Sequence, residues 1–136
     1  MHLKSSLTAL LISSLIVSSS CTKDEAPPAR TESVFIATLD GASESTPNPS
    51  KATGLATLTF NKTTKMLSGT ITFSGLTPTA GHIHKASKGV AGPVVVPFSS
   101  SASPINYPSA ALTDAQEADL YAGLYYVNLH SPSLLN

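Results

Sequence analysis

The chain has 136 residues, and its eight Lys and Arg residues balance eight Asp and Glu residues. Because it carries no net charge, nothing in its composition attracts nucleic acid, and we expect no nucleic-acid partner. The length allows one domain with a single core. Cys21 is the one cysteine, so no internal disulfide can form. Frequent Ser, Thr, Gly and Pro residues, with Val and Ile in short runs, favour strands and turns over long helices.

Residues 1–20 have the order of an export signal. Lys4 provides a positive start, Leu7–Val17 is an apolar stretch, and Ser18–Ser20 are small residues directly before Cys21. The apolar stretch is too short to cross a bilayer as a helix, which takes about 20 apolar residues. We therefore predict a signal peptide over residues 1–20.

Cys21 follows these small residues as the lipidated cysteine does in bacterial lipoprotein signals, which this segment resembles. Ser18 departs from that pattern, because Leu, Val or Ile usually stands three residues before the cysteine. The resemblance implies a lipid anchor on Cys21 that holds the protein to the outer membrane, at the cell surface or on the periplasmic side. The alternative is an ordinary secretory signal with an incidental cysteine. We favour lipidation, since a free thiol is a liability in an oxidising compartment.

Residues 21–32 are predicted to form a flexible tether, because Pro27 and Pro28 lie among polar residues without periodicity. Within this tether, Thr22–Glu25 is similar to short signals that direct some Gram-negative lipoproteins to the cell surface, and a solvated linker explains it equally well. The folded domain is expected to span residues 33–136.

The first half of this domain predicts three strands. Ser33–Leu39 alternates between apolar and polar residues before an Asp-Gly turn, and Gly41–Lys51 reads as a surface loop. Gly54–Phe60 and Leu67–Phe73 both alternate and are joined by a short polar connection, which predicts a hairpin with one face in the core.

The second half predicts three more strands and one helix. Gly81–Lys85 alternates, and Val94–Phe98 is apolar, with a proline that indicates a sheet edge or a strand end. Thr113–Gln116 has the capping-box pattern, so a short helix should begin there and end near Gly123. Leu124–His130 alternates again as a core strand. The fold class is therefore all-β, an antiparallel β-sandwich or barrel with one short helix before the last strand.

Four segments of the domain share one recognisable order and rough spacing, and they are Gly81-His82-Ile83-His84, Gly92–Val96, Leu112–Gln116 and Tyr126–His130. In this they resemble the CHRD (chordin-type) domain of the bacterial lipoprotein kind. The resemblance covers roughly Ser33–Pro132 and implies an extracytoplasmic β domain, without implying a particular biochemical activity. Family members usually continue with a Gly-Glu-Ile-Arg-Gly strand, whereas this chain ends at Leu134-Leu135-Asn136. Either the sequence is truncated, or the last strand is missing and a sheet edge stays uncovered.

His82, His84 and His130 are the candidate site residues. His82 and His84 lie two apart on a strand and so point the same way, and His130 is opposite the predicted core face of its own strand. Three neutral imidazoles suit Cu²⁺ or Zn²⁺. The pattern also resembles the copper site of the Cu/Zn superoxide dismutase sandwich, at the level of fold alone. The alternative is that the histidines have structural roles and bond to the backbone of nearby loops.

No arrangement typical of an enzyme emerges from the sequence, because the acidic residues cluster in the tether and the helix and no nucleophile motif or phosphate loop is present. We expect a lipid-anchored extracytoplasmic binding or structural module without catalytic activity. Its partner is the membrane, through the anchor, and an unknown extracellular protein or ligand. The alternative function is a copper- or zinc-binding protein with a three-histidine site, which a copper ion would make redox-active.

Overall fold

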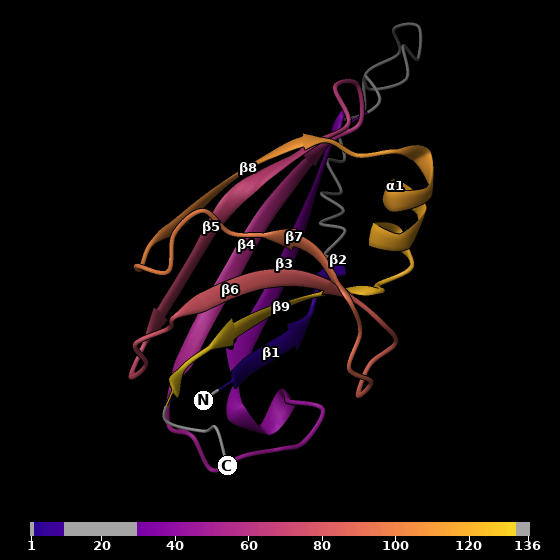
Figure 1. The fold of residues 1–136 in the computed structure, drawn as a ribbon. Coiled ribbons are helices and arrows are strands. Elements are labelled where there is room, and N and C mark those ends of the chain that lie inside the picture. The colour runs from indigo at the N-terminus through magenta and orange to yellow at the C-terminus, as the bar shows by residue number, and fades with distance from the viewer. Residues whose placement is uncertain (1, 10–29, 133–136) are drawn as a thin grey trace, which may run out of the picture.

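A computed structural model describes residues 2–9 and 30–132 of the chain (Figure 1). The regular secondary structure of the described part is mostly β-strand, with one α-helix and one short 3-10 helix. The elements are β1 (His2–Ser6), β2 (Thr8–Ala9), β3 (Glu32–Asp40), η1 (Gly41–Ser43), β4 (Thr53–Asn61), β5 (Met66–Ser74), β6 (Ala80–Lys85), β7 (Val94–Pro97), β8 (Ile105–Ala111), α1 (Asp114–Tyr121) and β9 (Tyr125–His130).

All strand pairs are antiparallel, and neighbouring strands follow the order β7-β6-β9-β1-β3-β4-β5-β8, with β2 also pairing with β3. In Figure 1, β6, β9 and β1 cross in front of β3, β4 and β5. One core cluster joins the two groups, with Phe35 and Leu58 from one and Ile83 and Val127 from the other. The sheet therefore folds onto itself in a sandwich-like arrangement, which confirms the predicted all-β class.

The predicted hairpin is formed by β4 and β5. Phe60 lies opposite Leu67, and Ala56 lies opposite Ile71. All four side chains are buried, while the residues between them are mostly exposed or half-buried. This alternation is what a strand with one wet face requires, so the apolar pattern in the sequence was sufficient to set the register.

The helix α1 begins and ends where its capping residues predict. The backbone N–H of Gln116 donates to Thr113 Oγ1 at 3.2 Å, and the backbone N–H of Thr113 donates to Gln116 Oε1 at 2.9 Å. Gly123 follows the helix with a φ of 69°, a left-handed conformation that glycine adopts without strain. Leu120 is fully buried and fixes the helix against the core.

Both ends of the sheet order carry prolines. β7 forms one edge, as its proline indicated. β8 forms the other edge and was not among the predicted strands, because Pro108 interrupts its pattern. β8 pairs only with β5, so a residue without an N–H is tolerated there.

Residues 2–9 supply two strands that the sequence does not predict. β1 pairs with β9 from His2 opposite His130 to Ser6 opposite Tyr126, so β9 has a strand on each side and is not an uncovered edge. This pairing does not test the signal-peptide prediction, which stays a prediction. Within the described ranges, no helix is long and apolar enough to cross a bilayer.

Candidate metal centre

Two neighbouring strands, β6 and β9, position the three histidines. Ile83 lies opposite Val127 in this antiparallel pair, and both side chains are buried in the core. Because side chains alternate along a strand, His82 and His84 project from the other face of β6. His130 projects from that same face of β9, which we call the histidine face. The predicted orientation of these side chains is confirmed.

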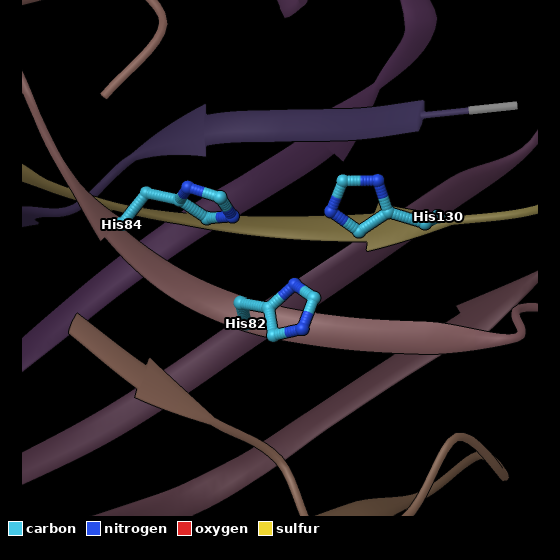
Figure 2. Close-up of side chains that lie close together, drawn as sticks. All are labelled: His82, His84 and His130. Atoms are coloured by element: carbon cyan, nitrogen blue, oxygen red, sulfur yellow. The ribbon is translucent and has the colours of Figure 1, made fainter. Parts of the chain in front are cut away.

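The three imidazoles converge as a cluster, shown in Figure 2. The ring centroid of His82 lies 5.5 Å from that of His84 and 5.1 Å from that of His130. The centroids of His84 and His130 are 6.0 Å apart. One ring nitrogen from each residue lies within 4.8 Å of the other two. His130 is more than 40 positions away from His82 and His84 in the sequence, yet the three form one donor set, which we call the tri-histidine cluster.

A backbone hydrogen bond sets the tautomer of His84. Its Nδ1 lies 2.9 Å from the carbonyl oxygen of Gly92, and a carbonyl can only accept, so Nδ1 carries the proton. Nε2 of the neutral ring is then left with a free lone pair. This Nε2 is buried and has no hydrogen-bond partner among the described residues. A second-shell carbonyl that orients an imidazole in this way is typical of histidines that bind metals.

Tyr126 and Gly92 hold His84 in place. The Tyr126 ring stacks on the His84 ring with centroids 5.1 Å apart and planes 11° apart. The backbone N–H of Gly92 donates to the Tyr126 hydroxyl at 2.9 Å. A Cβ on Gly92 would overlap the carbonyl oxygen of Lys85, so this position has no room for any side chain. Close backbone approach is therefore the reason for a glycine here.

His82 is the ring that burial affects most. Burial lowers the pKa of His82, because the charged imidazolium would lose hydration, and the nearby His84 lowers it further. Its buried Nδ1 has no hydrogen-bond partner among the described residues. The structural alternative, in which both residues bond to nearby backbone, therefore accounts for His84 Nδ1 and leaves His82 Nδ1 unexplained.

A cavity of about 310 Å³ lies beside the cluster. His84 and His130 line it together with Asn128, whose buried Oδ1 has no partner among the described residues. Glu44 adds a buried carboxylate from the segment that follows η1. Sequence reasoning missed Glu44, because it read residues 41–51 as a surface loop without periodicity. Asn128 could have been found from the sequence, because it lies two residues before His130 and therefore on the same face of β9.

The donor chemistry of the cluster fits a borderline-soft divalent ion. Neutral imidazole nitrogen binds Zn²⁺ at about 2.0–2.1 Å and is also a preferred ligand of Cu²⁺. The three donor atoms lie within 4.8 Å of one another, which is the range that ligands of one ion occupy. The cavity on one side leaves room for a fourth ligand. Cys21, the predicted lipidation site, lies outside the described residues.

A comparison with known families gives one match. The family model of the CHRD domain matches residues 35–133, which is most of the chain. No curated protein and no solved structure matches the chain.

Proposed function

The chain belongs to the CHRD domain family, and from this premise we propose that it is a lipid-anchored extracytoplasmic binding module whose ligand is a Cu²⁺ or Zn²⁺ ion held by the tri-histidine cluster. The family supports a binding or structural role. The proposed ligand rests on this chain's own residues. The proposal assigns no catalytic step to the protein.

The observation that carries the metal proposal is the state of His84. Its Nδ1–H is committed to the Gly92 carbonyl, and its Nε2 is buried beside two further imidazoles. A histidine with a purely structural role gains nothing from burying an unpaired nitrogen, which costs free energy of desolvation. A bound ion would satisfy that nitrogen and also hold the three rings together.

The donor set favours Cu²⁺ over Zn²⁺ in affinity. Three nitrogen donors without a thiolate follow the general order in which Cu²⁺ binds more tightly than Zn²⁺. Which ion is loaded in the cell then depends on metal availability as well as on affinity.

The anchoring proposal is supported by the N-terminal sequence. A positive residue, an apolar stretch and small residues precede Cys21 in the order of a lipoprotein signal. Lipidation of Cys21 would attach the domain to the outer membrane through the tether of residues 21–32, at the cell surface or on the periplasmic side.

Elemental analysis of the processed protein tests the metal proposal. The full chain is exported, extracted in detergent without a His tag, incubated with Cu²⁺ or Zn²⁺ and dialysed. We expect near-stoichiometric metal in the wild type and loss of that metal in a triple variant in which His82, His84 and His130 are replaced by Ala. Asn106→Ala on the distant edge strand β8 is the control and should retain the ion.

Stability provides a second readout for the same samples. An ion that binds only the folded protein stabilises it by about 2.7 kcal/mol at 100 times its dissociation constant, so Tm should rise with added metal. The Tm of the triple variant should not respond. Equal metal retention by the wild type and the triple variant, or no retention by either, would contradict the proposal.

A further inference from the structure

The sheet is continuous between β9 and β3 only because residues of the predicted signal peptide lie between them. β1 pairs with β9 along its whole length and meets β3 where Lys4 lies opposite Asp40. β2 continues along β3, with Thr8 opposite Ile36 and Ala9 opposite Phe35. We call the gap between β9 and β3 that residues 2–9 fill the strand slot.

Leu7 anchors this segment in the protein. Its side chain is 2% exposed and belongs to the same core cluster as Phe35 and Tyr125. Its backbone N–H donates to the carbonyl oxygen of Tyr125 at 3.2 Å. The segment therefore contributes a core side chain as well as strand hydrogen bonds.

Signal cleavage before Cys21, which is part of the proposed function, would remove both contributions. The backbone groups of β9 and β3 that face the slot would lose their partners, and the core would lose a leucine side chain. Unpaired strand edges readily take up another strand. Removing a buried leucine side chain also leaves a cavity, which in cores costs about 2–5 kcal/mol for Leu→Ala.

We propose that the processed domain takes up an extended segment of a partner polypeptide in the strand slot, antiparallel to both β9 and β3. Main-chain hydrogen bonds would supply affinity, and a large aliphatic side chain at the position of Leu7 would supply specificity, as in other cases of β-strand addition. This inference rests on the export part of the proposed function and not on the metal proposal.

The present occupant indicates what the partner segment looks like. Ser5 lies opposite the buried Val127 and is itself half-buried, so a small residue fits on the core face at that position. Two residues further along, on the same face, Leu7 fills the core. The partner segment should therefore have a small residue and then a large aliphatic residue two positions later, in extended conformation.

The tether of this chain is a poor candidate for the slot. Pro27 and Pro28 lie near its centre and have no N–H to donate to a ladder. A central position in a sheet needs hydrogen bonds on both sides, which makes consecutive prolines especially unsuitable there. A partner segment without proline is the better occupant.

A peptide-binding experiment on two forms of the full chain tests this inference. One form is produced without export and keeps residues 1–20, and the other is processed, extracted in detergent and checked for cleavage by mass spectrometry. The probe is a fluorescent peptide with the sequence of residues 2–9, and its anisotropy is measured. The control peptide carries Leu7→Asp.

We expect the processed protein to bind the probe, the uncleaved form not to bind it, and the control peptide to bind the processed protein at least 10-fold more weakly. The inference is overturned if the processed protein does not bind the probe, or if both forms or both peptides bind equally. If sedimentation shows dimers of the processed protein that the probe does not dissociate, a second copy of this chain occupies the slot and the proposed partner is wrong.

The test separates this inference from the metal proposal. An uncleaved chain in the cell would contradict both export and the slot inference, because β1 would stay in place, and mass spectrometry detects this before any probe is added. Metal retention is measured on the same processed sample before the probe is added, so the two outcomes are obtained separately.

Discussion

Gly92 shows how one residue without a side chain can control a site. Its carbonyl accepts from His84, its N–H donates to Tyr126, and its Cα lies against the backbone of Lys85. The sequence does not predict the contact with Lys85, because that contact depends on how the loop returns to β6.

Gly92→Ala should destabilise the domain and weaken metal binding together. The added methyl group would overlap backbone that cannot move independently, and overpacking of this kind costs about 1–3 kcal/mol. The displaced carbonyl would release His84, and loss of a second-shell partner lowers metal affinity about 10- to 100-fold. Denaturant unfolding and metal titration measure the two effects.

Gly89→Ala in the same loop is the matched control. No atom lies near a Cβ built at Gly89, but its φ of 80° is left-handed, which costs about 1–2 kcal/mol for a residue with a side chain. We expect Gly89→Ala to lower stability and leave metal affinity unchanged. Equal losses of affinity in both variants would show that the loop acts only through general stability.

At the scale of elements, α1 depends on its first turn. The capping box between Thr113 and Gln116 satisfies two N–H groups that the helix would otherwise leave without partners. Ion pairs from Lys65 to Glu117 and Asp114 join this end of the helix to the end of the β4–β5 hairpin. Leu120 is the helix residue most deeply buried in the core.

Thr113→Ala should lower the free energy of unfolding by about 1 kcal/mol, because the side-chain acceptor for the Gln116 N–H is lost. Thr113→Ser keeps the hydroxyl and should stay within a few tenths of a kcal/mol of the wild type. Chemical denaturation of both variants measures the difference. Similar destabilisation by Ala and Ser would mean that the Thr113 methyl group, and not the cap, stabilises this end of the helix.

The elements that the sequence predicts correctly are those with a simple local pattern. Alternation of residue types over the β4–β5 hairpin and β9, and the capping pattern of α1, identify each element from local residues alone. β8 was missed because Pro108 argues against a strand. The proline is tolerated there because β8 is an edge strand. β1 was missed because residues 1–20 match an export signal, and pairing with a distant strand leaves no local pattern.

The part of the candidate site that lies on strands was predictable from the sequence. Strand alternation placed His82 and His84 on one face, and the core residues of β9 placed His130 on that face as well. Glu44 could not be found in this way, because its approach to the cavity depends on how residues 41–51 fold back toward β9. Contacts set by a loop path have no signature in residue spacing.

At the scale of the whole molecule, the proposed lipid anchor on Cys21 would decide where the domain acts. Cys21→Ser should release the protein from membranes, because stable anchoring needs more than one acyl chain, and a lipoprotein cysteine supplies them. Wild type and the neighbouring control Thr22→Ala should remain in the membrane pellet after a carbonate wash. Continued sedimentation of the Cys21→Ser variant with membranes would contradict the lipid anchor.

The register between β1 and β9 has a consequence for how the molecule responds to its ligands. In this register, positions 2 and 4 of the strand slot lie directly opposite His130 and Asn128, which belong to the histidine face. Any strand in that register would therefore border an ion bound by the tri-histidine cluster. By thermodynamic linkage, the factor by which the strand changes ion affinity must equal the factor by which the ion changes strand affinity. The affinity of the domain for an ion would thus differ between the state with an occupied strand slot and the state with an empty one.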